Sequence, residues 1–320
     1  MSAADQPASD GDPVTPESAR TGWERLTPRI PSPVVELDDE RLRRHGVRLW
    51  LKRDDLIHPD LPGNKWRKLV GNLRRAADEG HRTLLTFGGA YSHHIAATAA
   101  AGRLLGIDTV GVIRGEAHRP LNPVLGRAAA DGMTLTYLDR ERYRRKHLPE
   151  VLDPLRERFG DFHHVPEGGS NDLGVRGCRD LGAEIAAQLP GTDLVCVPVG
   201  SGGTIAGVAA GVPPSWRVLG VSVLRGDGFL DPEVTRLQRE AFGGRRGDWS
   251  IDYRHHFGGY ARRTPELDGF MADFRARHGI RLEPVYVAKS LAAVYGTAGS
   301  PLVPAGSRVV AVVTGPPPWW

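Results

Sequence analysis

The segment 52–69 reads KRDDLIHPDLPGNKWRKL and holds one lysine, Lys65, in an unusual local setting. A proline, a glycine and Asn64 come directly before it and interrupt regular structure, whereas the run after it can form a helix. A lysine at such a junction is held in place by the backbone. We therefore expect Lys65 to stand at the start of a helix over about residues 65–80.

The reactivity of Lys65 depends on its charge, because only a neutral amine forms a Schiff base with a carbonyl group. Burial or a neighbouring cation favours the neutral amine, and Arg67 and Lys68 follow within three positions. The same two cations could hold an anion, such as the phosphate of a cofactor aldehyde. From these residues alone, the alternative is a structural lysine in contact with solvent.

Strand-like and helix-like patterns alternate along the rest of the chain. Strands are expected at residues 47–52, 82–87, 109–113, 133–138, 162–165, 194–199, 218–223 and 309–313, and further helices at 91–105, 120–131, 172–189 and 265–278. This alternation predicts an α/β fold with parallel sheets flanked by helices.

A glycine-rich loop follows one of these strands. Residues 200–211 read GSGGTIAGVAAG and open a helix of small residues. Successive backbone N–H groups and the helix dipole bind phosphate at such a turn, and Ser201 and Thr204 add hydroxyl donors. The loop lacks the ending of a P-loop and the spacing of a dinucleotide fingerprint, which favours a small phosphate over a nucleotide. A structural turn is the alternative, but a phosphate loop together with Lys65 is what pyridoxal phosphate needs.

The composition is ordinary for a soluble globular protein, with 40% hydrophobic and 25% charged residues. The net charge of +4 is small, and the basic run at 139–147 fits a solvent-facing helix, because no recognised nucleic-acid module accompanies it. No apolar stretch approaches the roughly 20 residues of a membrane span. We therefore expect neither a nucleic-acid partner nor membrane insertion.

Residues 1–29 contain few large apolar side chains, which predicts a disordered tail. The two cysteines, Cys178 and Cys196, lie among apolar or small residues, so we expect buried thiols and a reducing cytoplasm. Histidines occur in adjacent pairs at 93–94, 163–164 and 255–256. Adjacent residues do not face the same way on a helix or strand, so these pairs predict no metal site.

KRDDL and GNKWRKL around Lys65, and PEGGSN at 166–171, resemble the 1-aminocyclopropane-1-carboxylate deaminase and D-cysteine desulfhydrase family of pyridoxal phosphate enzymes, which has the tryptophan synthase β-type fold. The resemblance implies a two-lobed α/β protein of fold type II, each lobe a mostly parallel sheet flanked by helices. Pyridoxal 5'-phosphate would lie between a large cofactor-binding lobe, residues 30–66 with 167–320, and a small lobe, residues 67–166.

The resemblance also implies the cofactor contacts. Lys65 would bind the cofactor covalently and act as the catalytic base. The other expected contacts are Asn64, Lys68, His93, Gly200, Ser201, Gly202, Gly203, Thr204 and Thr314.

GGAYSHH at 88–94 is similar to the family segment that receives the substrate. Ser92 matches a serine beside the substrate carboxylate and Cα, and a loop leading into a helix can bind a carboxylate. His93 stands where many members have an Asn that contacts the hydroxyl oxygen of the cofactor ring. An imidazole can still donate a hydrogen bond, but its titration near neutrality would make the ring's electronics depend on pH. The alternative is that His93 and His94 are capping or surface residues.

FGGY at 257–260 and EPVYVAKS at 283–290 resemble two further family segments, each of which brings a tyrosine to the cofactor. Tyr260 and Tyr286 are the candidate proton donors. In the cyclopropane deaminases a Glu follows the second tyrosine and faces the pyridine nitrogen. Here Val287 occupies that position, which puts that activity in doubt.

The last expected strand leads to VVTGPPPWW. Thr314 and Gly315 match a family His-Thr-Gly-Gly terminus in which the threonine approaches the pyridine nitrogen, whereas Val313 and Pro316 depart from it. A neutral hydroxyl limits the ring as an electron sink, and elimination of a good β leaving group tolerates that limit. The terminal tryptophans at 319 and 320 could pack at the contact of a homodimer.

The resemblance therefore implies a lyase or deaminase for a small amino acid, foremost the β-elimination of D-cysteine to pyruvate, ammonia and sulfide. The alternatives are a 1-aminocyclopropane-1-carboxylate deaminase and a biosynthetic elimination or replacement enzyme for a larger amino acid. From another class, the chain could be a non-catalytic protein that binds a phosphate ligand.

Overall fold

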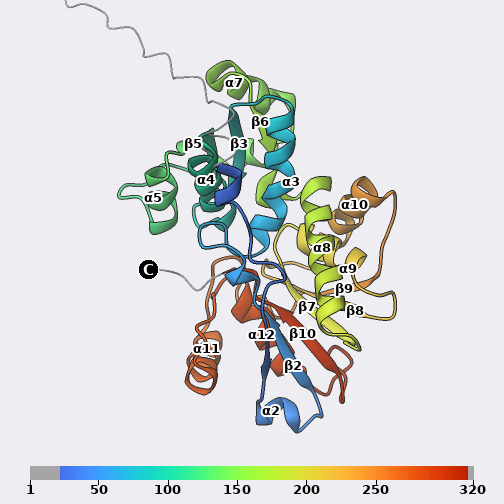
Figure 1. Cartoon of the computed structure of the whole chain (residues 1–320). Coiled ribbons are helices and arrows are strands. Elements are labelled where there is room, and N and C mark those ends of the chain that lie inside the picture. Colours follow the sequence, from blue (N-terminus) through green and yellow to red (C-terminus); the bar gives the residue numbers. More distant parts are fainter. Residues whose placement is uncertain (1–21, 316–320) are drawn as a thin grey trace, which may run out of the picture.

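The computed structural model describes residues 22–315, which form two sheets with helices on both faces (Figure 1). The larger sheet has the strand order β1-β2-β10-β7-β8-β9 and the smaller has the order β5-β4-β3-β6. β1 runs antiparallel to β2, and the other neighbouring strands are parallel. The predicted α/β class is confirmed.

The large sheet consists of β1 (Val34–Leu37), β2 (Arg48–Lys52), β7 (Leu194–Val199), β8 (Arg217–Ser222), β9 (Asp248–Asp252) and β10 (Arg308–Val312), and the short α2 (Glu40–Arg43) joins β1 to β2. Successive side chains of a strand point to opposite faces, and both faces are covered here. Leu49, Leu51 and Val309 pack with α11 (Pro265–His278) and α12 (Val287–Gly296). Trp50 and Val310 pack on the other face with α8 (Asp172–Gln188), α9 (Gly203–Gly211) and α10 (Leu230–Phe242).

The small sheet consists of β3 (Thr83–Gly88), β4 (Asp108–Arg114), β5 (Thr134–Leu138) and β6 (His163–Val165). Helices α4 (His93–Leu105) and α5 (Pro123–Ala130) pack on one face. On the other face lie α6 (Arg140–Arg144) and α7 (Pro149–Phe159). The short 3₁₀ helices η1 (Asp54–Leu56) and η2 (Glu167–Gly169) lie in the connections between the two sheets.

Helix α3 (Asn64–Asp78) contacts both halves of the molecule. Leu69 and Leu73 pack with the apolar side chains of α4. On the other side α8 approaches so closely that a Cβ on Gly177 would come within 2.0 Å of the carbonyl oxygen of Arg67. The strands of the two sheets come from within the sequence ranges expected for the two lobes. The lobe boundaries themselves stay a prediction, because α3 packs against elements of both lobes.

Residues 22–29 have a defined place against the small lobe, so the expected disordered tail is too long at its end. Leu26 is 3% exposed, and its carbonyl oxygen accepts a hydrogen bond of 2.9 Å from the indole of Trp66. The backbone N–H of Arg29 donates to Ile57 at 2.7 Å. The burial of Leu26 and its hydrogen bond with Trp66 hold this polar segment in place. Residues 1–21 of the expected tail lie outside the described residues.

A buried charge network joins α3 to β2 and α8. Arg67 donates hydrogen bonds to both oxygens of Asp54, at 2.8 and 2.9 Å, and to Glu184 at 3.1 Å. Lys52 at the end of β2 pairs with the same Glu184 carboxylate. Buried charges are tolerated when they are paired in this way, and breaking one pair leaves the partner uncompensated. The network therefore fixes α3 to the large lobe.

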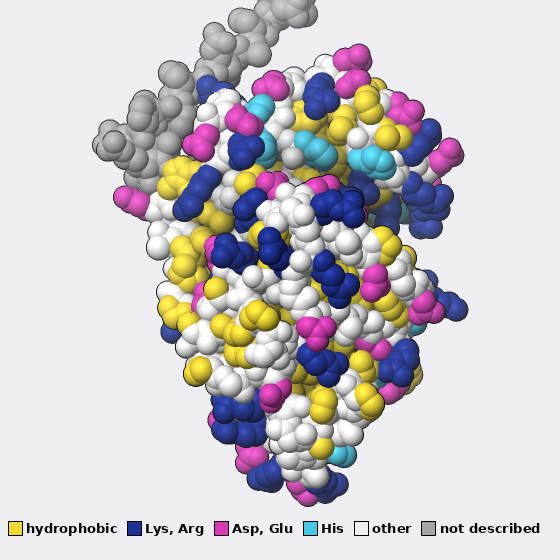
Figure 2. Space-filling view, turned by 90° about the vertical axis from the view of Figure 1, so that its right-hand side faces the viewer, with side chains coloured by type: hydrophobic (Ala, Val, Ile, Leu, Met, Phe, Trp, Pro, Cys, Tyr) yellow, Lys and Arg dark blue, Asp and Glu magenta, His cyan; other side chains and the backbone are white. Residues whose placement is uncertain are grey.

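The surface agrees with the small net charge. On the face shown in Figure 2, Lys and Arg side chains are spread over both lobes among Asp and Glu side chains. Within residues 22–315, no helix combines the length and the apolar character that a membrane crossing requires.

Gly63 fixes the start of α3 against the end of β10. Its φ of +69° and ψ of −152° lie in a region that only glycine adopts readily. A Cβ at this position would come within 1.8 Å of the carbonyl oxygen of Thr314. The same oxygen accepts a hydrogen bond of 3.2 Å from the backbone of Asn64. Lys65, the next residue, is thereby held close to the end of β10.

We predict that Gly63→Ala lowers the free energy of unfolding by about 3 kcal/mol or more, because backbone strain and the steric clash add. Gly80→Ala is the matched control, since Gly80 also has a positive φ of +76° but a Cβ there would meet nothing within 4 Å. The control should lose about 1 kcal/mol. Urea unfolding followed by circular dichroism measures both, and equal losses would contradict the prediction.

Candidate active site

A cavity of about 960 Å³ lies between the two sheets. Its walls include residues that directly follow β3, β7 and β10, where the carboxyl ends of parallel strands present loops. All of the predicted site residues except Gly203 line it: Asn64, Lys65, Lys68, Ser92, His93, Gly200, Ser201, Gly202, Thr204, Tyr260, Tyr286 and Thr314. The structure thus brings together residues that are up to 250 positions apart in the sequence.

Helix α3 begins at Asn64, so Lys65 is the second residue of its first turn. Burial, and then the positive charge of Lys68, lower the pKa of Lys65 from 10.5 to about 7. About half of the amine is then neutral at neutral pH, which is the form that reacts with an aldehyde. The expected unusual lysine is therefore unusual for the two reasons that the sequence indicated, desolvation and a neighbouring cation.

Arg67 does not line the cavity, although the sequence allowed it to bind an anion beside Lys65. Its guanidinium is held by Asp54 and Glu184, away from the cavity. Helical geometry explains the difference, because positions 65 and 67 point in different directions on a helix, whereas 65 and 68 share a face. Lys68 alone remains as the cation beside Lys65.

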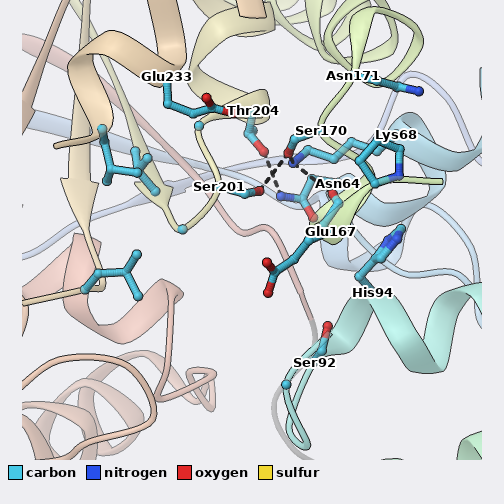
Figure 3. Close-up of a pocket in the computed structure, with 18 of the residues that line it drawn as sticks. Asn64, Lys68, Ser92, His94, Glu167, Ser170, Asn171, Ser201, Thr204 and Glu233 are labelled. Atoms are coloured by element: carbon cyan, nitrogen blue, oxygen red, sulfur yellow. Dashed lines mark hydrogen bonds between the residues drawn. The ribbon is translucent and has the colours of Figure 1, made fainter. Parts of the chain in front are cut away.

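The glycine-rich loop and Lys68 form one polar corner of the cavity (Figure 3). Lys68 donates hydrogen bonds to the hydroxyl of Ser170 and the carbonyl oxygen of Gly168, both at 3.1 Å. The hydroxyls of Ser170 and Ser201 lie 2.7 Å apart. A Cβ on Gly203 would lie 2.7 Å from the Ser170 hydroxyl and 3.0 Å from the Lys68 ammonium, so the glycine leaves room for both groups at the start of α9.

Asn64 joins the lysine segment to the same corner. Its side-chain amide donates a hydrogen bond of 2.9 Å to the hydroxyl of Thr204 in the first turn of α9. The N-terminal N–H groups of α9, the hydroxyls of Ser170, Ser201 and Thr204, and the Lys68 ammonium together form a site that suits a small dianion such as a phosphate.

Two tyrosines and a histidine form another wall. The rings of Tyr260 and Tyr286 meet edge to face with centroids 6.1 Å apart, and His93 lies 6.0 Å from Tyr286. A Cβ on Gly200 would come within 3.2 Å of the Tyr286 ring, so that ring lies directly against the glycine-rich loop. Burial raises the pKa of both phenols above 10.0, so both remain protonated and able to donate a proton.

The structure corrects the expectation for the histidines. Burial, and then Lys65, lower the pKa of His93 to about 4, so its imidazole is neutral over the physiological range and introduces no titration near pH 7. His94 is not a surface residue either. It is buried, and its Nε2 lies 2.8 Å from the hydroxyl of Thr86.

Two buried charged residues that sequence reasoning missed support the tyrosines. Glu283 accepts hydrogen bonds from the backbone N–H groups of Val285 and Tyr286, both at 2.7 Å. Lys289 donates one of 2.6 Å to the carbonyl oxygen of Gly259, next to Tyr260. Burial raises the pKa of Glu283 to about 7 and lowers that of Lys289 to about 8. Glu283 and Lys289 stand on either side of the segment PVYVA, and this placement was the available sequence signal.

Two further polar residues enter the cavity without having been predicted. Glu167 pairs with Lys146 at 3.1 Å, and Figure 3 shows its carboxylate pointing into the space between Ser92 and the polar corner. Ser170 lies in that corner. Both belong to PEGGSN, which the sequence marked as family-like without assigning a role to any residue in it.

The fold and the cavity define a class of protein. A reactive amine and an anion-binding corner in one cavity of a two-lobed α/β chain fit pyridoxal phosphate, which needs an amine for its aldehyde and a nest for its phosphate. The chain belongs to the pyridoxal-phosphate dependent enzyme family, whose model matches residues 25–315.

Individual relatives narrow this class. The chain is 31% identical to the D-cysteine desulfhydrase of Klebsiella pneumoniae over 280 residues, which cover 82% of this chain and 84% of that protein. It is 30% identical over 274 residues to the mitochondrial bifunctional D-cysteine desulfhydrase/1-aminocyclopropane-1-carboxylate deaminase of Arabidopsis thaliana, covering 79% and 67%. The crystal structure of an ACC deaminase homologue matches with a TM-score of 0.77 and 27% identity over 92% of this chain and 94% of that chain. The resemblance found in the sequence is confirmed.

We predict that cofactor binding reports the lowered pKa of Lys65. When pyridoxal phosphate is added to cofactor-free protein, the rate of covalent attachment should rise with pH and level off above about 7, because only the neutral amine reacts. Absorbance measured over a pH series gives the midpoint. Lys68→Met removes the neighbouring cation and should move the midpoint to higher pH. A wild-type midpoint near that of an ordinary lysine, about 10.4, would contradict the prediction.

Proposed function

We propose that this protein is a pyridoxal phosphate-dependent lyase that eliminates the β substituent of a small amino acid, with D-cysteine as the leading substrate. The single observation that carries the proposal is one cavity lined by Lys65, whose pKa is lowered to about 7, and by Tyr260 and Tyr286, whose pKa values are raised above 10.0. The relatives named as D-cysteine desulfhydrases support the choice of substrate. The products would be pyruvate, ammonia and sulfide.

When bound, the cofactor supplies an aldehyde for the amino group of the substrate and a ring that delocalises the charge left on Cα. Its phosphate would lie in the corner formed by Lys68, Ser170 and the start of α9. Thr314 would face the pyridine nitrogen with a neutral hydroxyl, and His93 would donate a hydrogen bond to the ring hydroxyl oxygen.

Lys65 is suited to remove the proton from Cα. Burial and Lys68 lower the pKa of its amine to about 7. The amine can therefore act as a base at neutral pH and as an acid after it has accepted a proton. Ser92 caps α4, where Ile95 donates its backbone N–H to the hydroxyl at 3.4 Å. The N-terminal N–H groups of α4 and this hydroxyl would hold the substrate carboxylate beside Lys65.

Tyr286 and Tyr260 would protonate the departing sulfur. A thiolate leaves more easily when a proton arrives with the bond cleavage, and a buried phenol supplies that proton without water. Glu283 and Lys289 hold the two tyrosines through the backbone, so the phenols would be oriented before the substrate binds.

Val287 argues against ring opening as the main activity. Its side chain is 1% exposed and packs in the core of the large lobe, so this position supplies no carboxylate to the pyridine nitrogen. Opening of 1-aminocyclopropane-1-carboxylate offers no good leaving group, whereas elimination of sulfide does. A replacement reaction would release sulfide without an equal amount of pyruvate, because the second nucleophile stays on the β carbon. Ligand binding without turnover would give no product.

A cytoplasmic location and a homodimer are part of this proposal. Both cysteines are buried free thiols, which fits a reducing compartment. The two terminal tryptophans expected at a dimer contact lie outside the described residues. Size-exclusion chromatography with light scattering measures the number of chains.

We predict that wild-type protein with bound cofactor releases sulfide and pyruvate in equal amounts from D-cysteine, and does so faster than from L-cysteine or 1-aminocyclopropane-1-carboxylate. Lys65→Ala should lose activity by at least about a thousandfold, because the covalent anchor and the base are both removed. Sulfide and keto-acid assays measure the products, and the visible absorbance reports the cofactor. Undiminished sulfide release by Lys65→Ala, or turnover restricted to a different substrate of the panel, would overturn the assignment.

We predict that Tyr286→Phe lowers kcat for D-cysteine by about a hundredfold or more, because the proton donor to the leaving group is lost. Tyr295→Phe is the matched control on the same helix, since Tyr295 packs with Phe270 and Phe274 away from the cavity. The control should keep kcat within about twofold. If the two variants lose activity equally, the phenol of Tyr286 has no specific role.

A further inference from the structure

A second polar cluster lies at the opposite end of the small sheet from the cavity. Glu79 caps the end of α3, His81 precedes β3, and His163 is the first residue of β6. β3 and β6 are paired in parallel with Leu84 opposite His163, which brings both histidines to the edge where the strands begin. The histidine pairs in the sequence gave no hint of this set, because its members are not adjacent.

Two of the three separations between the ligand atoms, those that involve Glu79, match a metal site. The carboxylate of Glu79 lies 3.4 Å from Nε2 of His81 and 3.4 Å from Nδ1 of His163, and it is the same oxygen in both contacts. All three ligand atoms lie within 4.8 Å of one another. A tetrahedral zinc ion with bonds of about 2.0–2.1 Å places neighbouring ligand atoms roughly 3.3–3.4 Å apart. The two observed separations have that value.

The second nitrogen of His81 lies near a carboxylate. An oxygen of Asp161 is 2.8 Å from its Nδ1, although the two groups do not have the alignment of a hydrogen bond. A carboxylate on the far nitrogen fixes the ring and makes the ligating nitrogen more basic.

The cluster is also accessible without being fully exposed. The side chains of His81 and His163 are 18% and 13% exposed, and that of Glu79 is 43% exposed. The rings are therefore fixed by their surroundings, and a water molecule can reach the position opposite them.

We propose that Glu79, His81 and His163 bind one Zn²⁺ ion, with a water molecule as the fourth ligand and Asp161 orienting His81. Two imidazoles and one carboxylate are a ligand set that zinc favours. The ion would tie the end of α3 to β3 and β6. Because α3 begins at the lysine segment, the site would stabilise the far end of the helix that carries Lys65, without contact with the substrate.

The test uses full-length protein with its cofactor and no histidine tag, treated with EDTA and then titrated with zinc chloride in a calorimeter. We expect one zinc ion per chain, with affinity lowered by more than about tenfold in Glu79→Gln and His163→Gln, and less in Asp161→Asn. His118→Gln is the matched control, an exposed histidine of the same lobe whose loss should leave binding unchanged.

A second measurement guards against misfolded variants. Zinc should raise the melting temperature of the wild type and of His118→Gln, but not that of Glu79→Gln, because a ligand stabilises only the state that binds it. Glu79→Gln should retain wild-type kcat for D-cysteine, since the cluster lies away from the cavity. Equal zinc affinity in the wild type and Glu79→Gln, or no zinc binding by the wild type, would overturn the proposal. Neither result depends on which amino acid the enzyme converts.

Discussion

The contact between Gly63 and the carbonyl oxygen of Thr314 is the constraint on which the active site depends. A side chain at position 63 would occupy the place of that oxygen, so the chain can turn into α3 here only with glycine. The turn sets the first residues of α3 against the end of β10. This contact between two backbone segments brings Lys65 and Thr314 into the same cavity. The two residues are the proposed partners of opposite ends of the cofactor.

Burial disfavours the charged form of both Lys65 and Arg67, but only Arg67 has carboxylate partners that offset this effect. Burial alone would lower the pKa of Arg67, but its hydrogen bonds to Asp54 hold that pKa above its ordinary value. Lys65 has no such carboxylate among its perturbing groups, and its pKa falls toward neutrality. The paired Arg67 connects α3 to Asp54 and to α8. Lys65, whose pKa is lowered, can act as a nucleophile and base. The two residues are separated by one position, so helix geometry alone assigns these different roles.

Particular residues show how far the sequence reaches. The strand and helix periods predicted most elements. The loop between β7 and α9 was also predicted, because a glycine-rich run after a strand and before small residues is typical of a turn into a helix. The sequence did not indicate β9, because DWSID carries a charge at each end and lacks a clean alternation. It did not indicate α12 either, because EPVYVAKS was interpreted only as a segment that brings a tyrosine to the cofactor. It also assigned residues 22–29 to the tail, because the average composition of 1–29 outweighed Trp23 and Leu26.

The sequence by itself determined the class of fold, the presence of a lysine at a helix start and the glycine-rich loop between β7 and α9, because each follows from a short contiguous pattern. Only the tertiary structure decided that Lys68 rather than Arg67 faces Lys65, that His93 is neutral, and that Glu283 and Lys289 hold the tyrosines. Pairing and burial depend on which distant segments meet. A pKa, a hydrogen-bond partner or a cluster such as Glu79 with His163 therefore has no local signature in the chain.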